Sequence, residues 1–319
     1  MKINRVLEEK QIFIYFFTVV LAIIVAFTVS GTTALEAVVN PALAFMLFVT
    51  FLQVPMVELK QAFLRVRFLG ALLVTNFVFI PLLAGGLILL LPSEPMIRLG
   101  VLLVLLTPCI DYVVTFSHLG RADSRLILAS TPVLLILQML FLPVYFSIFL
   151  GQAAVGLVHV GPFIHAFVWL IVIPLVLAAL VQLLTANNHT GQKILAGLNL
   201  LPIPATATVL FVVIAAVLPQ LGPAIEAVLK VIPIYLLFAI IAPLVGWGMS
   251  RLFSLKPPAG RAVAFSAATR NSLVVLPLAL AIPGAIPVLP AIIVTQTLIE
   301  LISQLIYVRL IPLLGKNYK

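Results

Sequence analysis

The residues of this sequence whose types could do chemistry lie inside three apolar stretches. The only cysteine of the chain, Cys109, stands between Pro108 and Asp111 in "TPCIDYVV". Arg270 lies in the small polar run "SAATRNS", and Glu300 lies in "TLIELISQ". A thiol can bind a soft ligand, an arginine keeps its positive charge, and a carboxylate can take up and release a proton. These residue types together indicate solute binding that is coupled to proton movement.

The composition places these residues in a membrane. The chain has 319 residues, of which 64% are hydrophobic and 8% are charged, whereas about a quarter of a soluble domain is charged. The apolar runs are continuous and near 20 residues long, which predicts membrane-spanning helices rather than the strands of a barrel. The net charge of +9 comes from scattered residues with no basic stripe, so nucleic-acid binding is excluded.

Hydropathy predicts an all-α polytopic membrane protein with ten transmembrane helices and one transporter domain over residues 1–319. The predicted spans are 11–30, 37–56, 68–91, 97–119, 126–150, 162–184, 198–219, 228–250, 260–283 and 287–313.

The distribution of lysines and arginines predicts that both termini are cytoplasmic, as in a multi-pass protein of the plasma membrane. The predicted outside loops hold only Arg98 and Lys230, and Arg270 lies inside a span. The fifteen lysines and arginines predicted to be cytoplasmic are Lys2, Arg5, Lys10, Lys60, Arg65, Arg67, Arg121, Arg125, Lys193, Arg251, Lys256, Arg261, Arg309, Lys316 and Lys319.

Ten spans divide into two halves, 11–150 and 162–313, at the nearly uncharged outside loop "GQAAVGLVHVGP". Five spans per half make the second half run through the membrane upside down relative to the first. This topology predicts two inverted five-helix repeats, the plan of many secondary transporters, with a site at the midplane on broken helices.

The centres of the fourth, ninth and tenth spans bring three charged residues to about the same depth. Asp111, Arg270 and Glu300 lie near these centres, where charges are costly and usually pair or face a cavity. Arg270 therefore needs a carboxylate, for which Asp111 and Glu300 compete, and the other could carry a proton. The alternative is a buried ion pair that only stabilises the bundle.

Pro108 predicts a break in the fourth span, because it removes a backbone donor and frees the carbonyl of Val104. In an opened helix Cys109 can bind solute, although a lone cysteine can also be a packing residue. Pro108 and Asn271 are the other candidate substrate contacts. Possible accessory groups are Thr107, Thr131, Ser266 and Ser272, although hydroxyls such as that of Thr131 often bond back to their own helix.

Other functions lack their motifs. The sequence has no Walker loop, no Gly-x-Ser-x-Gly and no His-Glu-x-x-His, and its histidines lack metal-ligand spacing, so neither an enzyme nor a cofactor or metal site is predicted. A receptor or scaffold that keeps a transporter fold is a further alternative. The expected partners are lipid, protons and a small solute, either a metalloid oxyacid or an organic anion, whereas the oligomeric state cannot be read from the sequence.

Four stretches resemble the arsenical-resistance permeases of the yeast type, a family within the bile acid:sodium symporter superfamily. These stretches are "FVTFLQVPMVELK", "NFVFIPLLAGGL", "TPCIDYVVTFSHLGRAD" and "TLIELISQLIYVRL", from the second, third, fourth and tenth spans. The resemblance implies a core of spans 3–5 and 8–10, with spans 4 and 9 broken and crossing, and a panel of spans 1, 2, 6 and 7. It also implies efflux of arsenite, and possibly antimonite, in exchange for protons, with Cys109 and Glu300 essential.

The ninth span departs from that family. The permeases show Asn-Asn-Phe-Glu where this sequence has "TRNSL". The sodium-coupled branch of the superfamily, which imports organic anions such as bile acids or pantothenate-like carboxylates, is the alternative. That branch places a glutamate where Ser266 stands, and a cation at a sodium site would repel sodium, so this alternative ranks second.

Overall fold

The computed structural model describes residues 2–53, 65–110, 112–151, 161, 165, 168–185, 189–220, 222–280, 282 and 284–315. These residues form helices and no strand. Asp111 and most of the loop "GQAAVGLVHVGP" lie outside the described residues.

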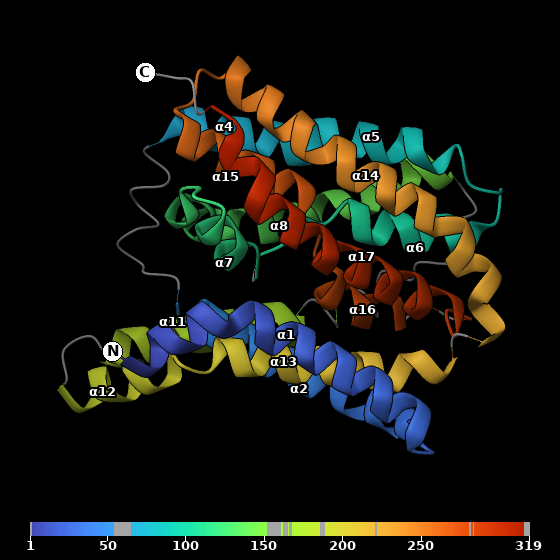
Figure 1. Ribbon diagram of the computed structural model, residues 1–319, viewed down its shortest axis with the longest axis horizontal. Coiled ribbons are helices and arrows are strands. Elements are labelled where there is room, and N and C mark those ends of the chain that lie inside the picture. Colours follow the sequence, from blue (N-terminus) through green and yellow to red (C-terminus); the bar gives the residue numbers. More distant parts are fainter. Residues whose placement is uncertain are drawn as a thin grey trace.

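The helices form two layers (Figure 1). The smaller, which we call the panel layer, contains α1 (Lys2–Thr28), α2 (Glu36–Phe51), α11 (Ile173–Thr185), α12 (His189–Leu198) and α13 (Pro202–Val217). The larger, the core layer, contains α4 (Val66–Val74), α5 (Ile80–Ile88), α6 (Pro95–Leu105), α7 (Tyr112–Leu119), α8 (Ser124–Leu150), α14 (Ile225–Leu252), α15 (Pro257–Ala268), α16 (Ser272–Leu280) and α17 (Val288–Leu310). This division of the helices matches the panel and core that the resemblance implies.

The described part of the chain contains eight helices that are long and apolar enough to cross a membrane. They cover Lys10–Thr28, Thr32–Phe51, Val66–Ile88, Ser124–Leu150, Val168–Thr185, Gly191–Gln220, Ile225–Leu252 and Val288–Leu313. Many large apolar side chains on them point outward, such as Phe27 at 73% and Leu184 at 79% exposure. Exposed apolar surface of this extent belongs in lipid, so the chain is a multi-pass membrane protein.

The two remaining predicted spans, 97–119 and 260–283, are each broken into two short helices. The first consists of α6 and α7, and the second of α15 and α16. Pro95 and Pro257 begin α6 and α15, at the position where a proline costs no helical hydrogen bond. The breaks fall at Pro108 and at the small polar run, as the sequence predicts.

Two local features bring other helices close to the second break. A π-helical turn, Thr75–Phe79, joins α4 to α5 and contains the fully buried Asn76. On α14, a Cβ on Gly246 would lie 2.7 Å from the Cβ of Ala267 and 2.8 Å from the Cα of Ala264. Because no larger residue fits there, α14 can pack directly against the end of α15 that leads into the break.

Candidate functional site

The two breaks cross each other and are joined by their backbones. Pro108 and Arg270 form an isolated antiparallel β-bridge. On either side of it, the N–H of Cys109 donates to the carbonyl of Thr269 (3.0 Å) and the N–H of Asn271 donates to the carbonyl of Thr107 (2.8 Å). Pro108 and Arg270 are thus a pair whose own N–H groups are not used in the bridge. A proline is tolerated there because no donor is missing.

A threonine ends the first half of each broken helix in the same way. The hydroxyl of Thr107 donates to the carbonyls of Leu103 and Val104, both at 3.0 Å, and the hydroxyl of Thr269 donates to that of Phe265 at 2.7 Å. The Val104 carbonyl, which the sequence predicted to be freed by Pro108, is therefore satisfied by Thr107. These bonds stabilise both helix ends without external ligands.

The guanidinium of Arg270 is fully buried between the two helix ends. Its Nη1 donates to the carbonyl of Leu105 (3.3 Å), the last residue of α6. Its Nη2 donates to the carbonyl of Ala267 (2.8 Å), to the carbonyl of Ser266 and to Oδ1 of Asn76 (2.9 Å). The carbonyl ends of helices carry partial negative charge, so two of them together can hold a buried cation.

The carboxylate of Glu300 is buried beside the same crossing and accepts three hydrogen bonds. The donors are the hydroxyl of Tyr112 (2.6 Å), the backbone N–H of Arg270 (2.7 Å) and Nε2 of Gln296 (2.6 Å). Three donors are the pattern that suits an ionised carboxylate. Glu300 therefore ties α17 to the first residue of α7 and to the break between α15 and α16.

The sequence leaves Asp111 and Glu300 open as carboxylate partners of Arg270, and in the structure Glu300 does not form a side-chain ion pair with it. Of the carboxylates that the structure describes, none lies within ion-pair distance of the guanidinium, and Glu300 reaches only the backbone of Arg270. The reason is that neutral oxygens surround the guanidinium instead. The competing partner, Asp111, lies outside the described residues.

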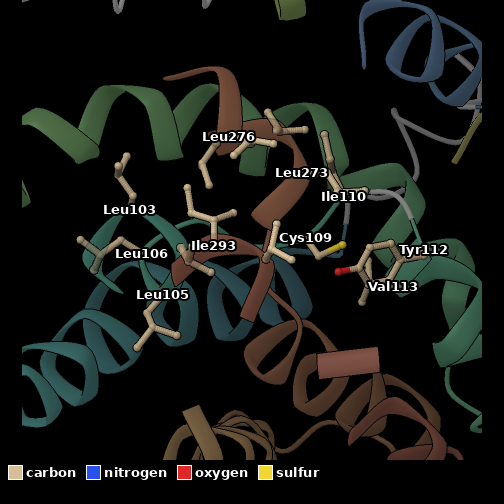
Figure 2. Close-up of a cluster of buried hydrophobic side chains, with 14 of the residues drawn as sticks. Leu103, Leu105, Leu106, Cys109, Ile110, Tyr112, Val113, Leu273, Leu276 and Ile293 are labelled. Carbon is tan, nitrogen blue, oxygen red and sulfur yellow. The ribbon is translucent and has the colours of Figure 1, made fainter. Parts of the chain in front are cut away.

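Cys109 lies at the crossing with no exposed surface. In Figure 2 its sulfur and the hydroxyl oxygen of Tyr112 point toward the same spot, within a wall of apolar side chains that includes Ile110, Leu273 and Ile293. The crossing therefore brings together three of the predicted residues, Cys109, Arg270 and Glu300.

The remaining predicted residues fall into two groups. Asn271 and Ser266 belong to the crossing. Within the described part of the chain, the buried amide atoms of Asn271 have no hydrogen-bond partner, and the hydroxyl of Ser266 accepts from Nδ2 of Asn76 (3.0 Å). Ser272 also belongs to it, because its hydroxyl donates to Gln296. Thr131 instead donates to the carbonyl of Ile127 (3.2 Å) on its own helix, as its residue type favours.

A small cavity lies beside Glu300. Its lining comes from α14, α17 and the end of α15, and includes Tyr235, Phe238, Gln296 and Tyr307. No group of three histidine, cysteine, aspartate or glutamate side chains among the described residues could hold a metal ion.

The sequence did not identify Tyr112, Gln296 or Asn76 as site residues. One signal was available: Gln296, Glu300 and Gln304 recur every four residues, so they share one face of α17. Gln304 lies on that face and donates to the hydroxyl of Thr269 (2.8 Å). Nothing in the sequence marks the π-helical turn that aims Asn76 at Arg270.

A family model described as the sodium bile acid symporter family matches residues 40–223, more than half of the sequence. The chain belongs to this family. Members of the sodium bile acid symporter family are transporters, which agrees with the membrane helices and with the buried polar crossing. The match includes Cys109 but ends before Arg270 and Glu300, so the second half of the site lies outside it. No curated protein matches the chain.

Proposed function

We propose that the chain is a secondary active transporter that exports arsenite in exchange for protons and binds it where the two broken helices cross. The observation that carries this proposal is the position of Cys109. The single thiol of the chain is buried at the crossing, and its neighbour Tyr112 donates to Glu300. A soft ligand and a proton-accepting group therefore meet at one place.

We also propose ten membrane spans arranged as two inverted repeats, 11–150 and 162–313. Thr107-Pro108-Cys109 and Thr269-Arg270-Asn271 support this arrangement, because they pair antiparallel around one bridge with matching threonine caps. In such folds the midplane site is exposed alternately to the two faces as one layer moves against the other. The panel and core layers are the two bodies that would move.

The chemistry of arsenite fits one thiol. As(OH)3 is uncharged at neutral pH, and it condenses with a thiol to give S–As(OH)2 and one water. The thiol proton leaves with the displaced hydroxide, so no net charge enters the buried site. One sulfur gives a bond that can be reversed by water, which is what release on the other face requires.

Glu300 is the proposed proton carrier. A protonated carboxyl has lost its charge and one acceptor position, so proton uptake would weaken its contacts to Tyr112, Arg270 and Gln296. These contacts hold both broken helices to α17. Protonation would therefore change the energy of the crossing itself and couple protons to its movement.

The test is uptake of radiolabelled arsenite into everted vesicles under an imposed pH gradient, comparing the parent with Cys109→Ser. The proposal expects uptake that requires the gradient and falls at least tenfold in the variant. Equal uptake by the two would assign Cys109 to packing.

Uptake of an organic anion such as a bile acid or a pantothenate-like carboxylate is the second candidate, because the matching family is named for sodium and bile acid. Sodium-dependent uptake of such an anion that Cys109→Ser leaves unchanged would establish it in place of arsenite efflux.

A further inference from the structure

One nitrogen of the buried guanidinium of Arg270, Nη2, has more acceptor oxygens around it than it has hydrogens. Nη2 carries two hydrogens, yet the carbonyls of Ser266 and Ala267 and the amide oxygen of Asn76 all lie within hydrogen-bond distance of it. At the same time Nε of Arg270 has no hydrogen-bond partner among the residues that the structure describes. Oxygens that bind a guanidinium usually lie along its separate N–H directions. Here they converge on one point, which is how oxygens coordinate a metal cation in proteins.

The oxygens also come from the places that hold cations in transporters with broken helices. Leu105 is the last residue of α6, and Ser266 and Ala267 lie in the last turn of α15. Half-helix carbonyl ends and unwound backbone carbonyls coordinate sodium in such folds. The guanidinium thus occupies the position where two carbonyl ends concentrate negative potential.

The fourth oxygen, Oδ1 of Asn76, is oriented by the hydrogen bonds of its own amide group. Nδ2 of Asn76 donates to the carbonyl of Leu72 (3.0 Å) and to the hydroxyl of Ser266 (3.0 Å). With both amide hydrogens used, Oδ1 must face the guanidinium. We call the four oxygens of Leu105, Ser266, Ala267 and Asn76 the cradle. Its Asn76 oxygen is held by these hydrogen bonds, so the cradle would persist if the guanidinium were removed.

We propose that the guanidinium of Arg270 is a tethered substitute for a monovalent metal cation in this cradle. The chain accordingly binds no sodium there, and removal of the guanidinium creates a site for sodium or lithium formed by Leu105, Ser266, Ala267 and Asn76. The binding site is independent of which solute is carried. Only its consequence, that protons rather than sodium drive transport, rests on the proposed function.

The experiment measures the melting temperature of the purified full chain in detergent, in sodium, lithium, potassium or choline chloride at equal ionic strength. We expect the parent to melt at the same temperature in all four salts. Arg270→Ala should melt lower in choline and regain several degrees, saturably, in sodium or lithium or with millimolar ethylguanidinium, because ligands that bind only the folded state raise the melting temperature.

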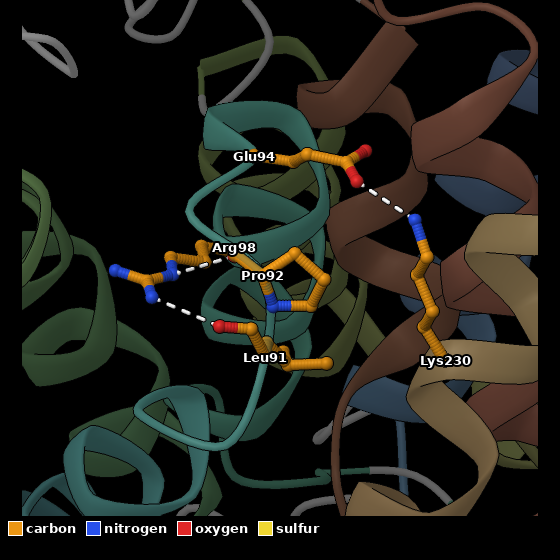
Figure 3. A network of polar contacts seen from close by, with 5 residues as sticks. All are labelled: Leu91, Pro92, Glu94, Arg98 and Lys230. Carbon is orange, nitrogen blue, oxygen red and sulfur yellow. Dashed lines mark hydrogen bonds and ion pairs between the residues drawn. The ribbon is translucent and has the colours of Figure 1, made fainter.

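Two further variants make the result specific. The guanidinium of Arg98 also donates to two backbone carbonyls, those of Leu91 and Pro92, both at 2.9 Å, but near the surface (Figure 3). Water can replace it there, so Arg98→Ala should show no preference among the four salts. Asn76→Ala combined with Arg270→Ala should lose most of the sodium response, because one of the four oxygens is gone.

Either of two results would overturn the proposal. One is equal melting of Arg270→Ala in all four salts with no recovery in ethylguanidinium. The other is a saturable rise of the parent's melting temperature in sodium over potassium and choline, which remains decisive even if Arg270→Ala does not fold. The melting temperatures do not depend on the proposed transport of arsenite, because no arsenite is present in the measurement. A failure of the transport proposal would therefore not affect this test.

Discussion

At the residue scale, the account depends on how buried polar groups are satisfied. The centres of the predicted spans put Cys109, Arg270 and Glu300 at about the same depth, and the structure places all three at the crossing. The sequence could not predict what Arg270 touches, since backbone carbonyls have no signature in a sequence. Arg270 therefore looked like half of an ion pair, whereas helix ends and Asn76 surround its guanidinium.

Tyr112→Phe tests whether Glu300 is ionised in the folded protein. The variant removes the donor to Oε1 of Glu300, and a buried hydrogen bond to a charged group contributes about 1.5–3 kcal/mol. Tyr307→Phe is the matched control, because its hydroxyl donates to the neutral carbonyl of Ala239, for which about 0.5–1.5 kcal/mol is expected. The free energies of unfolding should therefore fall more for Tyr112→Phe, and the reverse order would contradict an ionised Glu300.

At the element scale, the two breaks were predictable and their surroundings were not. Pro108 and the run "SAATRNS" interrupt otherwise apolar spans, which is a pattern that a sequence displays. The π-helical turn at Thr75–Phe79 and the close approach of α14 to α15 depend on packing between distant segments. No local pattern of residues encodes either of them.

Gly246→Ala tests the contact between α14 and α15. The added Cβ would clash with Ala264 and Ala267, and overpacking of a buried contact costs about 1–3 kcal/mol. Gly248 is the matched control on the same helix, because a Cβ there meets nothing within 4 Å, and Ala in a helix is about 1 kcal/mol better than Gly. The melting temperature should fall for Gly246→Ala and should stay the same or rise for Gly248→Ala. Equal shifts would show that the two helices are not held by this glycine.

At the scale of the whole molecule, hydropathy accounts for most of the architecture. Eight of the ten predicted spans correspond to helical segments long enough to cross a membrane, and the other two are the ones broken at the crossing. The two layers follow from which helices pack together (Figure 1), and only the resemblance to a known family supplied that division in advance.

The proposed orientation places Lys193 on the cytoplasmic face and Lys230 on the opposite face. In a Cys109→Ser background, Lys193→Cys and Lys230→Cys each provide one thiol for a membrane-impermeant maleimide. Intact cells should label only Lys230→Cys, and permeabilised cells should label both. Labelling of Lys193→Cys alone in intact cells would show that the chain has the opposite orientation in the membrane.

The central claim is that protons drive transport through Glu300 at the crossing, and one measurement tests it most directly. The initial rate of arsenite accumulation in everted vesicles is recorded with and without a pH gradient for the parent, Glu300→Gln, Asp111→Asn and Glu94→Gln. The control is Glu94, which directly precedes the first residue of α6 and whose exposed carboxylate pairs with Lys230 (2.8 Å; Figure 3). The account predicts that only Glu300→Gln loses the response to the gradient. Accumulation that still follows the gradient in Glu300→Gln but not in Asp111→Asn would contradict it.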